Sequence, residues 1–153
     1  MSGSCTEMRR RVRGFTLVEL VTIMILVGIL AAVAIPRMDT SVYHTVQFHD
    51  QTVAALRFAQ KTAVSHRRLV CVTFANNHTL ALRIASTSGG ACAMDLLLPG
   101  STSNELPSSD AKTAYFDPLP ATLSFYADGT SSGASFSAGG TLISVIEETG
   151  YVR

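Results

Sequence analysis

The stretch RGFTLVELVTIMILVGILAAVAIP, residues 13–36, decides how this chain is organised. A cation and a glycine are followed by 21 residues, from Phe15 to Ile35, in which Glu19 is the only ionisable side chain. A helix rises about 1.5 Å per residue, so a run of this length can cross a hydrocarbon core about 30 Å thick. The stretch therefore predicts a transmembrane helix over residues 15–36, with one carboxylate near its start.

The segment before this run is cationic. Residues 1–14 contain four arginines and one glutamate, whereas Arg37 and Asp39 nearly cancel just after the run. Positively charged flanks stay in the cytoplasm, so this asymmetry places the N-terminus inside the cell and the rest of the chain outside it.

Two common kinds of N-terminal segment compete with a processed membrane helix. A secretory signal peptide is one alternative, because Ala32-Val33-Ala34 matches an A-x-A cleavage site. An uncut signal anchor is the other. Neither explains Glu19, since a carboxylate inside a membrane helix costs about 2.5–3.5 kcal/mol at the centre, less near an end, and usually has a partner. A cut after Gly14 would supply that partner as a new ammonium on Phe15.

The motif from Arg13 to Glu19, with the apolar run behind it, resembles the N-terminus of type IV pilins and of the pseudopilins of type II secretion. The resemblance implies that a prepilin peptidase at the inner membrane cuts between Gly14 and Phe15 and then methylates the Phe15 amine. It also implies that Glu19 pairs with the N-terminus of an adjacent subunit during assembly. Pro36 falls where pilins often carry a proline that bends the helix, and it removes one helical hydrogen bond.

Beyond the membrane run, residues 37–153 predict one globular head. Apolar side chains recur at spacings of three and four within residues 37–67, as expected of an amphipathic helix. Residues 68–153 contain short β-branched stretches separated by turns, including a long polar loop at 99–112. We therefore predict the α+β class, with one long N-terminal helix packed on an antiparallel sheet, and the resemblance implies the type IV pilin fold.

The three cysteines fall on both sides of the predicted cut. Cys5 lies in residues 1–14 and would leave with them, whereas Cys71 and Cys92 stay in the exported head. An even pair in an oxidising compartment predicts a disulfide. The alternative is two unpaired thiols, with Cys71 buried in a strand.

The whole chain is similar to the GspH/FimT group of minor pilins and pseudopilins, and most similar to the MshC-type minor pilin of mannose-sensitive haemagglutinin pili. Some FimT-like members bind DNA through a C-terminal Gly-Arg-x-Arg tail. Here Gly150 and Arg153 match that tail, but Tyr151 replaces its first arginine. Loss of residues 1–14 also leaves 8 Lys and Arg against 10 Asp and Glu, a net charge of −2. We therefore expect nucleic acid to be an improbable partner, with Arg153 as a candidate contact; Arg67 and Arg68 could contribute, but a solvated helix end explains them better.

No pattern in the sequence indicates catalysis, a cofactor or a metal. The histidines show no ligand spacing with cysteines or carboxylates; they are His44, His49, His66 and His78. The expected partners are the prepilin peptidase, other pilin or pseudopilin subunits, the inner-membrane assembly platform and, before assembly, membrane lipid. The alternatives to an MSHA-type minor pilin are a GspH-like pseudopilin of type II secretion and a FimT-like competence pilin.

Overall fold

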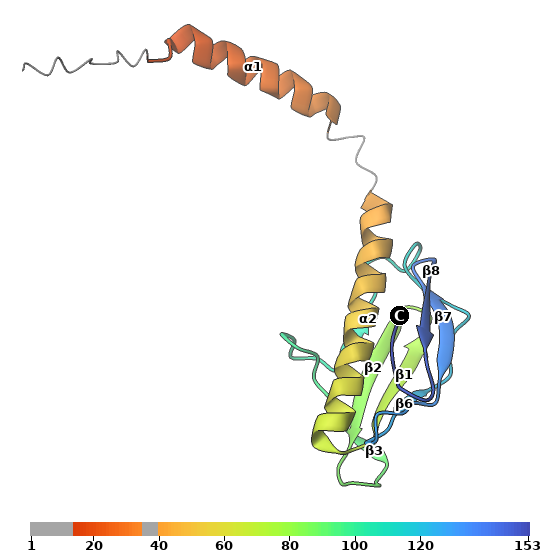
Figure 1. The fold of residues 1–153 in the computed structure, drawn as a ribbon. Coiled ribbons are helices and arrows are strands. Elements are labelled where there is room, and N and C mark those ends of the chain that lie inside the picture. Colours follow the sequence, from red (N-terminus) through yellow and green to blue (C-terminus); the bar gives the residue numbers. More distant parts are fainter. Residues whose placement is uncertain (1–13, 35–39) are drawn as a thin grey trace, which may run out of the picture. The chain divides into compact units, whose positions relative to one another are not determined.

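A computed structural model describes residues 14–34 and 40–153 of the chain (Figure 1). These residues form two compact units, one on each side of residues 35–39. The predicted helix-bending residue, Pro36, and the leader cysteine, Cys5, lie outside the described residues.

The first unit is one helix, α1 (Leu17–Ala34). Every large apolar side chain described between Leu17 and Leu30 is exposed, and these side chains surround the helix instead of forming one stripe. A helix that is apolar on all sides normally lies in a membrane or a large protein core. Within residues 14–34 and 40–153, no helix is both long enough and apolar enough to cross a membrane.

The second unit begins with α2 (Thr40–His66), which matches the helix predicted over residues 37–67. Its buried side chains follow helical spacing and form one face: Phe48, Thr52, Ala55, Leu56, Ala59, Thr62 and Ala63. The helix ends at His66, and the next residue, Arg67, has a left-handed backbone with a φ of 51°. Arg68 N–H donates to Ala63 O and Arg67 N–H donates to Val64 O, which is the Schellman arrangement that satisfies the last helical carbonyls.

The larger sheet packs against the buried face of α2. Its strands are β1 (Val70–Asn76), β2 (Thr79–Ala85), β3 (Cys92–Asp95), β4 (Glu105–Pro107) and β6 (Leu123–Phe125). Their order is β3-β2-β1-β6, with β4 on the same edge of β2 as β3, and all pairs are antiparallel. Alternate residues of β1 are buried, so Val70 and Val72 face the core and Cys71 and Thr73 face away from it.

A smaller antiparallel sheet completes the head. It contains β5 (Phe116–Asp117), β7 (Ala134–Ala138) and β8 (Thr141–Val145), in the order β5-β7-β8. The C-terminal residues pair with the other edge of β8 through a bridge between Val145 and Val152. The turn before this tail needs Gly150, because a Cβ there would lie 2.6 Å from Gly129 O.

Four phenylalanines join α2 and both sheets in one core. Phe48 of α2 lies 4.8 Å from Phe116 of β5 between ring centroids, and Phe116 lies 5.0 Å from Phe74 of β1. Phe136 of β7 contacts both Phe74 and Phe116 edge to face. Because these rings come from every layer, the cluster fixes the smaller sheet onto the helix and the larger sheet.

Phe116→Ala is expected to lower the free energy of unfolding of the head by about 3–5 kcal/mol, since its ring is 2 % exposed and touches three others. Chemical denaturation of the detergent-solubilised chain, followed by near-ultraviolet dichroism of its tyrosines, measures the change. Leu119→Ala is a matched control, because Leu119 is 53 % exposed. Equal losses for the two variants would contradict this assignment of the core.

The α+β class predicted from the sequence is confirmed. The predicted polar loop over residues 99–112 is wrong at its centre, because Glu105–Pro107 form β4 and pair with β2. Neither β4 nor β5 carries an apolar pattern, and each is held by backbone bonds to a partner that is distant in sequence.

Candidate functional site

The start of α1 is capped by Thr16. The Thr16 side-chain oxygen accepts a hydrogen bond from Glu19 N–H at 3.2 Å, and Thr16 O accepts one from Leu20 N–H at 3.2 Å. Thr16 is therefore the N-cap residue and Glu19 the third residue of the helix, which is the spacing of a capping box. The cap fixes where the helix begins, at Leu17, three residues after Gly14.

Glu19 sits in the first turn of α1, where the helix dipole favours a negative charge. A hollow at this end is lined by Gly14, Phe15, Thr16 and Glu19. The structure thus brings together the two residues of the predicted cut and the predicted assembly residue. A free amine on Phe15 would border the same hollow as the Glu19 carboxylate, so this end can present one cation and one anion on an otherwise apolar surface.

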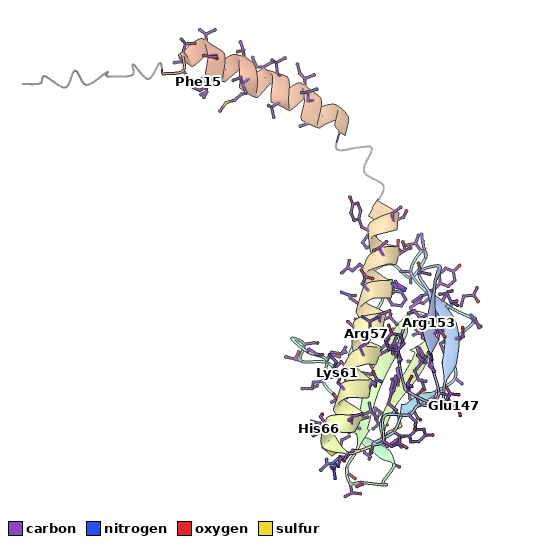
Figure 2. All side chains as sticks on the ribbon, viewed as in Figure 1. Phe15, Arg57, Lys61, His66, Glu147 and Arg153 are labelled. Atoms are coloured by element: carbon purple, nitrogen blue, oxygen red, sulfur yellow. A yellow bond between two sulfur atoms is a disulfide. The ribbon has the colours of Figure 1, made fainter. Side chains whose placement is uncertain are left out.

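Within the described residues 14–34, nothing covers that apolar surface. Phe15 is 76 % exposed, and side chains project from α1 on all sides (Figure 2). Exposed apolar area of this extent is buried by lipid or by other proteins. The prediction from the sequence was a transmembrane helix over residues 15–36, and the large apolar side chains described from Phe15 to Leu30 are exposed.

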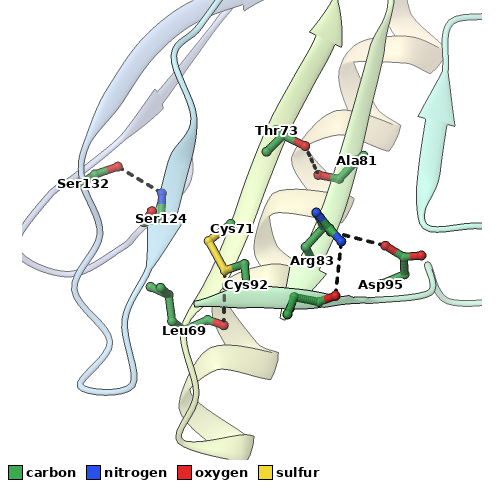
Figure 3. Close-up of a disulfide and its surroundings, with 10 residues drawn as sticks. Leu69, Cys71, Thr73, Ala81, Arg83, Cys92, Asp95, Ser124 and Ser132 are labelled. Atoms are coloured by element: carbon green, nitrogen blue, oxygen red, sulfur yellow. Dashed lines mark hydrogen bonds and ion pairs between the residues drawn. A yellow bond between two sulfur atoms is a disulfide. The ribbon is translucent and has the colours of Figure 1, made fainter. Parts of the chain in front are cut away.

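The second predicted feature, the disulfide, is present in the structure. Cys71 of β1 and Cys92 at the start of β3 are bonded, with their Cα atoms 6.1 Å apart (Figure 3). The bond lies on the face of the larger sheet that is turned away from α2, near Arg83 and Ser124. It secures β3, a short edge strand whose last three residues are exposed.

Replacing both cysteines with serine is expected to lower the free energy of unfolding by about 3 kcal/mol, because the bond closes a loop between residues 21 positions apart. Denaturant unfolding with and without reductant measures the loss. The reductant should destabilise the natural chain and leave the Cys71→Ser/Cys92→Ser chain unchanged. Alkylation of both thiols in the native, unreduced protein would contradict the bond.

The C-terminal tail, which carries the predicted nucleic-acid contact, lies between β8 and α2. Arg153 exchanges two backbone hydrogen bonds with Ser144 of β8. From the other side, an Arg57 guanidinium N–H donates to Val152 O at 3.2 Å, and Gln60 donates to Thr149 O at 2.8 Å. Arg153 is exposed, and Arg57 binds the backbone carbonyl of the residue before it. Sequence reasoning missed Arg57, because only the fold brings α2 to the tail.

A loop on the head packs against the first turns of α2. His44 Nδ1 lies 2.9 Å from the Ser109 hydroxyl oxygen. In the same loop, the Lys112 N–H and the Thr113 hydroxyl donate to the Asp110 carboxylate and hold the pKa of that group below its usual value. Asp110 is half-buried, and its bonds to Lys112 and Thr113 order the loop. Across residues 14–34 and 40–153, no cluster of histidines, cysteines and carboxylates could hold a metal ion.

Comparison with known proteins gives separate results for the N-terminal segment and for the fold. Residues 9–35 match the family model for the prokaryotic N-terminal methylation motif. No curated protein sequence matches the chain.

Among solved structures, the chain resembles the type IV minor pilin FimU of Pseudomonas aeruginosa, with a TM-score of 0.53 and 18 % identity over 74 % of this chain and 90 % of that one. The minor pseudopilin EpsH of the type 2 secretion system of Vibrio cholerae is also similar, with a TM-score of 0.48 and 11 % identity over 75 % of this chain and 94 % of that one. At these identities the likeness to FimU shows the fold, and no argument rests on EpsH. The chain therefore joins a prokaryotic N-terminal methylation motif to an α+β head of the type IV pilin-like fold.

Proposed function

We propose that this chain is a minor subunit of a type IV filament, made as an inner-membrane precursor and assembled through α1. One observation carries the proposal. A capped helix with exposed apolar side chains begins three residues after the glycine of a methylation motif and presents Glu19 in its first turn. In a globular enzyme or carrier the apolar side chains of such a helix would stay in contact with water. In a filament subunit they are buried by lipid before assembly and by other helices afterwards.

In this proposal, α1 and its flanking residues hold the precursor in the inner membrane, with the head in the periplasm. Prepilin peptidase cuts between Gly14 and Phe15 and methylates the amine of Phe15. The Glu19 carboxylate then pairs with the amine of a neighbouring subunit, and the assembly platform lifts the chain out of the bilayer. The apolar side chains of α1 pass from lipid into a bundle of helices, so most of the apolar burial is retained during extraction.

The N-terminus of the mature chain tests this proposal directly. Mass spectrometry of the chain isolated from cells should find N-methylated Phe15 as its first residue. A chain that begins at Ile35 would instead identify a signal peptide cut after Ala34, and an intact leader would identify a signal anchor. Either result would overturn the filament proposal.

The particular filament is proposed on resemblance. Helix residues 48–61 and the following segment 67–72 are most similar to the MshC-type minor pilin, which favours an MSHA-type pilus over a type II secretion pseudopilus. Affinity isolation of the tagged chain with its filament separates the two, because the major subunit recovered should be an MSHA-type pilin. Recovery with a secretion pseudopilin would establish the GspH-like alternative.

The FimT-like alternative rests on the C-terminal tail, which carries Arg153 and binds Arg57 through Val152 O, although Tyr151 replaces an arginine. Two cations neutralise few phosphates, so we expect no DNA binding at physiological salt. Salt-dependent retardation of DNA by the natural chain, lost in an Arg57→Gln/Arg153→Gln chain, would favour that alternative instead.

A further inference from the structure

Three segments of the head meet where α2 ends, after His66, and leave a hollow of about 300 Å³ between them (Figure 2). The segments are the end of the helix, the loop between β2 and β3, and the turn after β6. The residues that line this hollow, called the helix-end hollow below, are Arg67, Leu69, Gly89, Tyr126, Ala127 and Asp128. Its volume is at the small end of the range for ligand pockets, which is about 300–1,000 Å³.

Bonds within the head hold each wall of the helix-end hollow. Ala85 N–H donates to Leu69 O at 2.8 Å, which joins the helix end to β2. Gly129 N–H donates to Tyr126 O at 3.1 Å and closes the turn after β6. The disulfide fixes the end of the loop between β2 and β3 at Cys92. A site whose walls are fixed before binding loses little conformational entropy when a ligand enters.

Arg67 has a backbone conformation that strains most residues with a side chain. Its φ of 51° is left-handed, and the Schellman ending of a helix usually places glycine at this position. The helix dipole favours a cation here, but Arg68, the next residue, supplies one without a left-handed backbone. Among the described residues, no hydrogen bond or ion pair holds the Arg67 guanidinium, so the fold itself does not use this side chain. The guanidinium is therefore available to a ligand in the hollow that it lines.

The other lining side chains select the kind of anion. A guanidinium binds a carboxylate through two parallel hydrogen bonds, and Leu69, Ala127 and the Tyr126 ring offer apolar surface beside it. Asp128 accepts hydrogen bonds from the Thr130 hydroxyl at 2.7 Å and the Thr130 N–H at 3.0 Å, and these bonds hold the pKa of its carboxyl below the usual value. This fixed negative charge repels a doubly charged phosphate more than a single carboxylate, and it can accept a hydrogen bond from an N–H of the ligand.

We propose that the helix-end hollow binds a carboxylate carried by an apolar group, with Arg67 as its cation and Asp128 as the acceptor for a neighbouring N–H of the ligand. A polypeptide that ends in an apolar residue has all three features, because its terminal carboxylate lies next to both an apolar side chain and an amide N–H. The C-terminus of such a polypeptide is therefore the class of ligand that fits the hollow. This site lies on the head and does not depend on the N-terminal motif, so it goes beyond the function proposed above.

Backbone amide chemical shifts of the detergent-solubilised full chain measure binding of a small probe, N-acetyl-L-leucine. The probe should shift the amides of Gly89 and Ala127 in a saturable titration, whereas the uncharged N-acetyl-L-leucinamide should bind at least about tenfold more weakly. Arg67→Gln should weaken binding of the acid by the same factor. Arg68→Gln is the matched control and should bind normally, because Arg68 does not line the hollow. Equal binding of acid and amide, or tighter binding of inorganic phosphate, would overturn the proposal.

Arg67→Gly gives a second readout that a purely structural arginine would not produce. Glycine takes the left-handed backbone without strain, so this variant should unfold at a higher denaturant midpoint and yet lose binding of N-acetyl-L-leucine. Arg68→Gly is the matched control and should lower the midpoint, because Arg68 is not left-handed. A lower midpoint for Arg67→Gly would show that the fold needs the arginine side chain, and binding at the natural affinity would exclude that side chain from the site. Either result would refute the assignment of Arg67.

Discussion

Gly14→Val is expected to leave the chain as an uncut precursor that keeps residues 1–14. A protease that contacts the substrate backbone beside the scissile bond leaves no room for a branched side chain at that position. Glycine permits this close contact because it has no side chain. We expect cleavage to slow by about 100-fold, equal to about 2.7 kcal/mol in the transition state. The intact mass of the membrane-bound chain, measured over time after synthesis, reports the fraction cut.

The structure supplies the control for this experiment. A Cβ on Gly14 would meet no atom within 4 Å, so a side chain there leaves the fold unchanged. Gly28, in the middle of α1, is equally open. Gly28→Val should therefore be cut at the natural rate, although it adds the same side chain to the same apolar segment. Slow cutting of both variants would assign the effect to membrane insertion instead of to the peptidase.

The two parts of the chain differ in how much their sequence alone predicts. The N-terminal site is formed by residues close together in the sequence, since Gly14, Phe15 and Glu19 lie within six residues. Their spacing and charge are enough to predict the site. The structure adds the cap made by Thr16, which the spacing Thr16-x-x-Glu19 already contains as a capping box. Reading that spacing would have located the first residue of the helix.

The head could be predicted only where periodicity is strong. Helix α2 and strands β1 and β2 follow their apolar patterns, whereas β4 and β5 are two or three residues long and depend on partners elsewhere in the chain. The roles of Arg57 and Gln60 were not predicted for the same reason, because their hydrogen bonds to the tail join residues about 90 positions apart in the sequence. Such contacts follow from the packing of α2 against the sheets, which no local pattern encodes.

The start of α2 shows the limit of periodicity in the opposite direction. Val42 and Val46 belong to the same spacing series as the half-buried Val53, and this series predicted a helix face packed on the sheet, but both are exposed. At this end α2 extends beyond the side chains of the head that pack against it, so its apolar pattern continues onto exposed positions. An apolar pattern predicts that a helix face is buried, but it does not show whether the same chain covers that face.

Glu19→Ala is expected to be cut and methylated normally but to enter filaments at least about 100-fold less often. In a bundle of apolar helices, the Phe15 amine of a neighbour would be buried without a counter-charge, and removing one member of a buried pair costs about 3–5 kcal/mol. The helix itself should persist, because alanine favours helix and the Thr16 cap binds the backbone N–H of residue 19, which every variant keeps. Filaments sheared from cells and probed for the chain measure incorporation, with the membrane fraction as the measure of cleavage.

Two further variants identify charge as the cause. Glu19→Gln retains the size and hydrogen-bonding capacity of the side chain but loses its charge, so it should fail as Glu19→Ala does. Glu148→Gln removes a carboxylate from an exposed turn of the head and should assemble normally. If Glu19→Gln assembled like the natural chain, a hydrogen bond rather than an ion pair would hold the neighbouring N-terminus. Since an uncut precursor places a peptide nitrogen where the mature chain has an ammonium, the Gly14→Val and Glu19→Ala defects should not add, and the double variant should incorporate no less than Gly14→Val alone.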